Sequence, residues 1–339
     1  MHARTLRIFR LYQLFNGIIF TGPVWAVYLL SRGLTLTQFG LVEAALHVGM
    51  LVAQVPTGAL ADALGRRRLL VAAGFFTAVG ELGYVYAPGF GLICLAGGLI
   101  ATWSRPAAFW LTAICSLIAS GIASRLPDDA RGSARQGLSV ARSGLSALRR
   151  SPRLAVLTIA WSIYWAAFTS AWFYAAPLFA ERGASDAMLG FALGGGMLVG
   201  AGFSWLGGRM HDRTSLTATV GGTSLVAAVA LVLGPALPGL ALPVLMLLVV
   251  AGLPELVYVT LSTYLQHNTR SEYRATSMSI AEGCFSIQML WLFPLVGYSV
   301  QHAGYGTGFA LCADLMATGA ALFIASQKLP GLEPAPATT

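Results

Sequence analysis

Charged side chains are scarce in this sequence of 339 residues. They make up 10% of it, and hydrophobic residues make up 56%, with a mean hydropathy of +0.71. Soluble domains carry roughly 25% charged residues. A soluble fold could not bury so much apolar surface, so the composition excludes an ordinary soluble domain. We therefore expect an integral membrane protein made of apolar helices.

The sequence also lacks the patterns on which most enzymes depend. Its 4 cysteines lie singly in apolar segments, without the close pairs of zinc or redox motifs. We find no nucleophile and base set, nucleotide loop or metal cluster, so we predict no enzyme activity, catalytic residue, metal or cofactor. The net charge of +8 is spread over short clusters between apolar runs, which argues against nucleic acid as a partner.

Apolar stretches long enough to cross a bilayer, which takes about 20 residues, recur along the whole chain. The first follows three arginines, as in a signal peptide, but it is too long and lacks a clear cleavage site, so we expect it to be retained. The predicted spans are 8–30, 38–61, 69–87, 106–125, 154–180, 187–206, 215–235, 241–263, 275–298 and 306–326. A further apolar piece at 89–103 is short for a span.

Arginine clusters indicate the topology, because cations collect on the cytoplasmic side of a membrane. One cluster is Arg66 to Arg68, and another occupies the segment from Arg125 to Arg153. If both are cytoplasmic, an even number of spans separates them, and the spans 69–87 and 106–125 already supply two. We therefore expect the piece at 89–103 to be re-entrant, interfacial or packed against protein. Both termini are then cytoplasmic.

The chain repeats itself at a constant offset of 150 residues. The matching elements are Arg32-Gly33 with Arg182-Gly183, Gly40 with Gly190, and Gly58-x-x-x-Asp62 with Gly208-x-x-x-Asp212. Such weak symmetry is typical of transporters with two related halves. We predict a shortened transmembrane half at 1–125, a cytoplasmic linker at 126–153 and a transmembrane half of six helices at 154–339. The linker pattern fits an amphipathic helix at the inner membrane surface and a solvated charged linker equally well.

These residues resemble the major facilitator superfamily of secondary transporters. The segment from Gly58 to Arg68 is similar to the family signature between the second and third helices, and Gly208 to Arg213 stands where the second half carries the same loop. The segments at 274–277 and 294–298 resemble those of bacterial drug-efflux members. The resemblance implies an all-α bundle, here with about ten membrane helices in unequal halves of four and six.

The first half departs from that family pattern of twelve helices. It runs for about 119 residues against about 175 in the second half, a deficit of about two spans, and the resemblance implies that most of helices four and five are missing. Two functions therefore stay open. One is proton-coupled export of drug-like or small amphipathic molecules by alternating access; the other is a transport-inactive remnant with a structural or interaction role.

The signature implies a gate on the cytoplasmic side. In the family an acid at the position of Asp62 is thought to hold the cytoplasmic side closed by binding the start of the penultimate helix, which lies at 275–277 here. Arg66 would pair with Asp62. The residues assigned to this gating motif are Gly58, Asp62, Gly65, Arg66, Arg67, Gly208 and Asp212. The alternative is that the loop acts only as a topology signal.

Acids inside spans are candidates for proton or substrate binding, because each costs about 2.5–3.5 kcal/mol at the centre of a helix. Glu255 follows Pro254 and precedes Tyr258 by about one turn, on a helix that lines the cavity in the family. The full set of candidates is Glu255, Glu282, Glu43, Gln13, Asn16, Trp161, Trp165 and Tyr258. The alternatives are hydrogen-bonded packing for the acids and an interfacial belt or lipid contact for the aromatic residues.

The expected location is the bacterial inner membrane, where the chain would be a multi-pass protein. The expected partners are the lipid bilayer and a small-molecule substrate, and the expected energy source is the proton gradient. We expect the protein to be a monomer.

Overall fold

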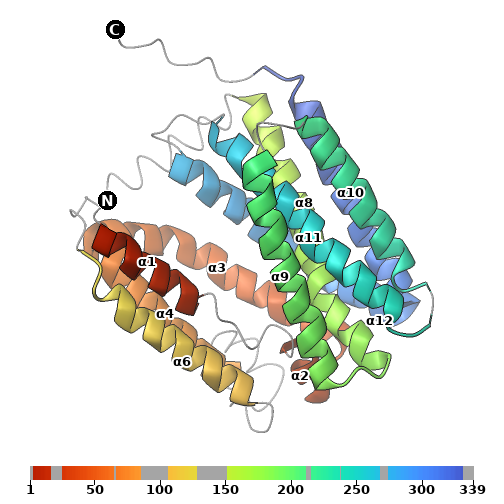
Figure 1. Ribbon diagram of the computed structural model, residues 1–339, viewed down its shortest axis with the longest axis horizontal. Helices are drawn as coiled ribbons and strands as arrows, with labels where there is room; N and C mark the ends of the chain where they lie inside the picture. The colour runs from red at the N-terminus through yellow and green to blue at the C-terminus, as the bar shows by residue number, and fades with distance from the viewer. Residues whose placement is uncertain are drawn as a thin grey trace. The chain divides into compact units, whose positions relative to one another are not determined.

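The computed structural model describes residues 3–16, 25–64, 66–84, 106–127, 151–210, 215–236, 238–267 and 274–330, and side chains for most of them. Contacts divide the chain into two compact units, Met1–Ser139 and Val140–Thr339. Within the described residues every regular element is a helix (Figure 1).

The helices coincide with the predicted spans. In the first unit they are α1 (Ala3–Asn16), α2 (Trp25–Ser31), α3 (Leu36–Leu64), α4 (Arg66–Tyr84) and α6 (Pro106–Ala123). In the second unit they are α8 (Pro152–Glu181), α9 (Asp186–Met210), α10 (Leu216–Leu233), α11 (Ala241–His267) and α12 (Arg274–Ser326). The span predicted at 8–30 is shared by α1 and α2. The piece at 89–103 lies outside the described residues.

Length and composition identify a multi-pass membrane protein. Among the described helices, 5 are long and apolar enough to cross a bilayer, all in the second unit, and shorter apolar helices occur at 36–52, 70–79 and 112–123. The prediction of an all-α membrane bundle is confirmed.

The first unit packs through small residues. Helix α6 contacts α1 and α4, and a core cluster forms around Tyr12, Ala119 and Ala123. A Cβ atom at Gly74 of α4 would lie 2.7 Å from the carbonyl oxygen of Ser116. Glycine therefore lets the two helices approach closely, as small residues do in membrane bundles.

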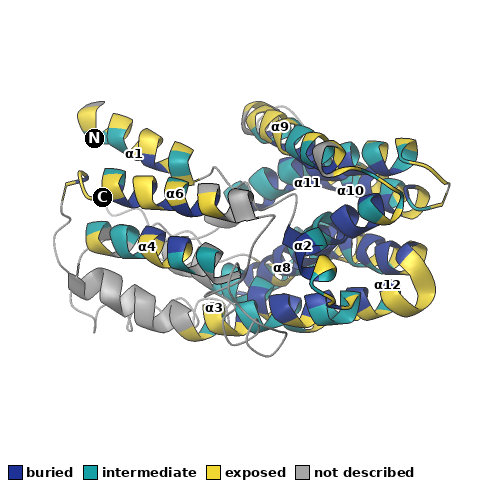
Figure 2. Cartoon of the chain, turned by 90° about the horizontal axis from the view of Figure 1, so that it is seen from below, coloured by how far each residue is buried: buried dark blue, intermediate teal, exposed yellow. Residues whose placement is uncertain are grey.

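Helix α8 is the buried centre of the second unit. It begins at Pro152, a favoured first residue, and Ser151 caps it by accepting a hydrogen bond from the Leu154 N–H at 3.3 Å. It packs against α12 and α11, and the Tyr174 hydroxyl donates to the carbonyl oxygen of Phe293 at 3.0 Å. Figure 2 shows α8 mostly in the colour of buried residues, whereas α9 carries long exposed stretches.

Helix α12 contains the last two predicted spans. Gly304 interrupts it with φ 83° and ψ 166°, a conformation that favours glycine. This kink lies between the spans predicted at 275–298 and 306–326. The sequence predicts two separate helices here, and in the structure they follow each other without a loop.

The structure repeats the turn that the sequence repeat predicts. Gly33 and Gly183 lie two residues after the ends of α2 and α8, with φ values of 88° and 80°. In both turns the next helix then begins at a hydroxyl cap: Thr35 accepts from the N–H of Gln38, and Ser185 accepts from the N–H of Met188. The two units therefore share this helix–turn–helix motif in detail.

Candidate functional site

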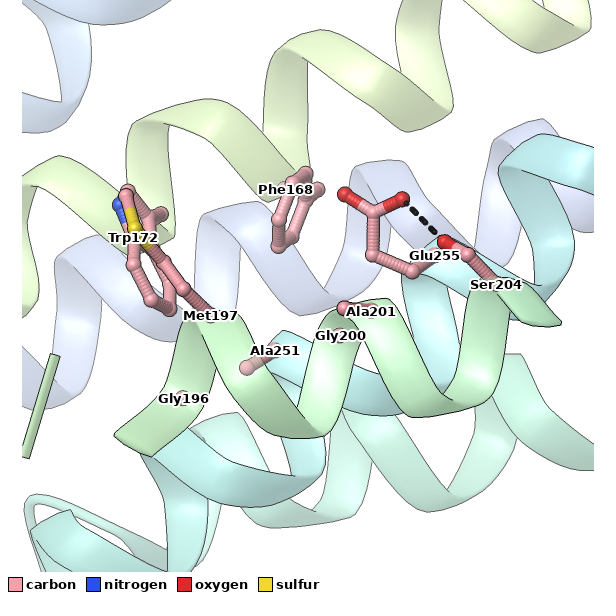
Figure 3. Close-up of a pocket in the computed structure, with 9 residues that line it drawn as sticks. All are labelled: Phe168, Trp172, Gly196, Met197, Gly200, Ala201, Ser204, Ala251 and Glu255. Carbon is pink, nitrogen blue, oxygen red and sulfur yellow. Dashed lines mark hydrogen bonds between the residues drawn. The ribbon is translucent and has the colours of Figure 1, made fainter. Parts of the chain in front are cut away.

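A pocket of about 360 Å³ lies in the second unit, walled by α8, α9 and α11 (Figure 3). Most of its wall is apolar, and its polar side-chain groups come from one serine, one acid and the indole N–H of one tryptophan. The lining residues are Phe168, Trp172, Gly196, Met197, Gly200, Ala201, Ser204, Ala251 and Glu255. An apolar cavity with few polar groups is the usual form of a small-molecule site.

Glu255 is the acidic group of the pocket. It is half-buried on α11, and the Ser204 hydroxyl of α9 donates a hydrogen bond to its Oε2 at 3.1 Å (Figure 3). Pro254 precedes it inside the helix and removes one backbone N–H donor. A carboxyl group in an apolar wall can bind a proton or balance the charge of a cationic ligand.

Two glycines of α9 make room for the pocket walls. A Cβ atom at Gly196 would lie 3.0 Å from the Trp172 ring, and one at Gly200 would lie 3.2 Å from Cγ of Glu255. The spacing of the two glycines is the small-x-x-x-small pattern by which membrane helices approach. We did not predict these glycines or Ser204 as site residues, although that spacing is visible in the sequence.

The aromatic residues of α8 form a series of ring contacts that leads to the pocket. Trp161 is 2% exposed and lies 5.8 Å from Tyr258, centre to centre, and Trp165 lies 4.5 Å from Tyr258. Trp165 also contacts Phe168 at 4.6 Å, and Phe168 lines the pocket. Trp161 and Phe168 are buried, so a lipid-facing belt does not describe them.

Glu282 of α12 belongs to the same neighbourhood. It is half-buried, and Tyr258 interacts electrostatically with both Glu282 and Glu255. Two of the predicted acids therefore act electrostatically on the same tyrosine, although only Glu255 lines the pocket.

The remaining candidates lie in the first unit or outside the described side chains. Gln13 and Asn16 are exposed on α1, and Glu43 is buried on α3 beside His47. Of the gating motif, Arg67 donates to the carbonyl oxygen of Leu126 at 3.4 Å. Gly58 and Asp62 are on α3, Arg66 begins α4 and Gly208 is on α9, but the structure describes only the backbone of these four residues, and Gly65 and Asp212 lie outside the described residues.

A family profile identifies the chain. The profile of the Major Facilitator Superfamily matches residues 82–290, more than half of the sequence. The chain belongs to this superfamily. Membership places this superfamily protein among membrane transporters.

Relatives and solved structures agree with this superfamily fold. The chain is 30% identical over 95 residues to an uncharacterized MFS-type transporter of Methanocaldococcus jannaschii, and this match spans 25% of that relative. It is similar to the crystal structure of the human organic anion transporter MFSD10, with a TM-score of 0.65 and 16% identity over 93% of this chain and 90% of that one.

Two further transporter structures show the same fold. The nucleoside transporter NupG has a TM-score of 0.71 and 14% identity, covering 96% of this chain and 100% of its own. A bacterial homologue of the human lysosomal transporter Spinster has a TM-score of 0.68 and 14% identity, covering 96% of each chain.

Proposed function

We propose that this superfamily member is a proton-coupled exporter of small amphipathic molecules in the bacterial inner membrane. The observation that carries the proposal is the pocket of the second unit, where Glu255 and Ser204 provide the polar groups of an otherwise apolar and aromatic wall. Transport would proceed by alternating access, with the two halves rocking around a binding site.

The pocket wall supports an amphipathic substrate. Phe168 and Trp172 offer ring faces, and Glu255 offers a negative charge when it is ionised. Ring faces attract organic cations and stack on flat apolar groups. A molecule that combines a flat apolar body with a positive charge therefore matches the pocket in both respects.

The same acid supports proton coupling. When Glu255 is protonated, its attraction for a cation is lost, so a proton and a cationic substrate compete for one site. A proton that binds Glu255 from one side of the membrane therefore releases the substrate on that side. In this way a proton gradient drives the exchange of protons for substrate. Glu282, which interacts electrostatically with the same Tyr258, is a second acid that could take part.

Reconstituted vesicles with an imposed pH gradient test the proposal, with ethidium as a fluorescent aromatic cation. We expect the wild type to accumulate ethidium and Glu255→Gln to lose the accumulation. Asp314→Asn is the matched control, because Asp314 is an exposed acid on α12 that does not line the pocket. Equal accumulation by Glu255→Gln and wild type would contradict the role of this acid.

The shortened first half supports the alternative of a transport-inactive remnant. Its roughly 119 residues leave no room for six membrane helices of about 20 residues each with their loops. A remnant would move neither ethidium nor an organic anion or nucleoside at any gradient. Folded protein that binds these probes without moving them would favour this alternative.

A further inference from the structure

A carboxyl group and an imidazole are buried side by side in the first unit. Glu43 and His47 are one turn apart on α3, with 6% and 5% of their surfaces exposed, and Oε2 of Glu43 lies 3.9 Å from Nε2 of His47. Ionisable groups inside membrane spans are costly and are typical of ion and proton paths. Neither residue lines the pocket of the second unit.

The sequence repeat provides a second, independent observation. At the offset of 150 residues α3 aligns with α9, so His47 takes the position of Met197. Met197 lines the pocket of the second unit. Glu43 takes the position of Leu193, one turn earlier on the same helix. The face of α3 that carries His47 therefore corresponds to the pocket-lining face of α9, with an ionisable residue in place of an apolar one.

In this unit α2 and α4 pack against α3, and these segments carry the ionisable groups of its neighbours. Arg32, just after α2, donates to the Tyr28 hydroxyl at 3.2 Å, and Arg67 donates to the carbonyl oxygen of Leu126. The ionisable residues of these segments are Tyr28, Arg32, Arg66, Arg67, Arg68, Glu81 and Tyr84, of which the side chains of Arg66, Glu81 and Tyr84 lie outside the described residues.

We propose that Glu43 and His47 jointly bind one exchangeable proton and form a second coupling site, in addition to Glu255. This proposal rests on the proposed transport function. With the proton bound, the pair has no net charge, whether the proton is on the carboxylate oxygen or on the second ring nitrogen. When the proton leaves to water, a carboxylate and a neutral imidazole remain, with a net charge of −1. One proton is therefore taken up and released per cycle without any other reactant.

The titration of His47 tests the pair without any transport assay. The full chain, labelled with ¹⁵N-histidine and held in lipid nanodiscs, gives ring nitrogen signals, and the signal lost in His47→Asn identifies this residue. We expect Glu43→Gln to move the titration midpoint of His47 by more than about one pH unit, as for two strongly interacting groups. Glu43→Asp, which keeps a carboxyl group, should retain the coupling and guards against misfolding of the glutamine variant.

Two further variants serve as controls for the titration of His47. Glu255→Gln changes the acid of the other unit, and His302→Asn changes an exposed histidine of α12. We expect both to leave the midpoint of His47 unchanged. A midpoint that is the same in Glu43→Gln, Glu43→Asp and wild type would overturn the proposal.

A vesicle assay then separates coupling from transport. We expect Glu43→Gln and His47→Asn to lose ethidium accumulation driven by a pH gradient while they keep ethidium exchange without a gradient. Driven accumulation at the wild-type level in both variants would overturn the proposal. If the wild type moves no ethidium, the proposed function fails for this probe, whereas the titration of His47 still decides whether the pair binds a shared proton.

Discussion

Gly200 of α9 leaves the space that the side chain of Glu255 occupies on α11. A Cβ atom at position 200 would lie 3.2 Å from Cγ of Glu255 and 3.0 Å from the carbonyl oxygen of Ala251. The position of the acid in the pocket therefore depends on a residue without a side chain on the neighbouring helix.

Gly200→Ala should weaken substrate binding, because the added methyl group requires the acid to move by a few tenths of an ångström. Alanine is the better helix former by about 0.8–1.0 kcal/mol, so the helix itself is not weakened. We expect a higher KM for ethidium transport, measured in vesicles. Gly202→Ala is the control, because a Cβ atom there meets no atom within 4 Å. Equal KM values for the two variants would contradict this role of Gly200.

Gly319→Ala should destabilise the packing of α12 on α8. The added Cβ atom would lie 2.9 Å from the carbonyl oxygen of Ala160 and 3.1 Å from the backbone nitrogen of Tyr164, and backbone atoms cannot rotate away. Overpacking of this kind costs about 1–3 kcal/mol. Thermal unfolding in detergent measures the effect as a lower Tm. Gly306→Ala, on the same helix with no atom within 4 Å, should unfold near the wild-type temperature.

Ser204→Ala removes the hydrogen bond that the hydroxyl donates to Oε2 of Glu255. Hydrogen bonds to charged groups contribute about 1.5–3 kcal/mol when they are buried, and less at this half-buried site. Since the bond favours the ionised acid, we expect the pH profile of ethidium transport to shift, while Tm stays near that of the wild type. Ser170→Ala, a buried serine on α8 outside the pocket lining, should leave the profile in place.

A reporter fused after Val140 tests the topology. The arginines at 125–153 predict a cytoplasmic linker between the two halves. A reporter that is active only in the cytoplasm should therefore be active at this position, and one that is active only in the periplasm should be silent. The opposite pattern would show that the piece at 89–103 crosses the membrane or that another predicted span does not.

Much of the fold could be predicted because apolar length and arginine position are local properties of the sequence. The turn at Gly33 and its copy at Gly183 were visible for the same reason, as a dipeptide repeated at a fixed offset. Residues 17–24 of the predicted first span lie outside the described residues, so α1 and α2 correspond only to its two ends.

The pocket could be predicted only in part. Glu255 was visible as an acid in an apolar helix, but its partner Ser204 is on a helix 51 residues earlier in the chain. Which face of α9 meets α11 depends on the packing of Gly196 and Gly200, which sequence position alone does not determine. The aromatic residues of α8 suited both lipid contact and a pocket, and their burial and their ring contacts with Tyr258 depend on tertiary packing that the sequence does not show.

The most direct test of the account measures proton movement driven by the substrate. Proteoliposomes that contain a pH-sensitive dye receive an ethidium gradient and no pH gradient. If Glu255 couples the two fluxes, ethidium moving in one direction drives protons in the other. The internal pH then changes with the wild type and stays constant with Glu255→Gln. Ethidium that crosses with the wild type while the internal pH stays constant would contradict proton-coupled transport through this pocket.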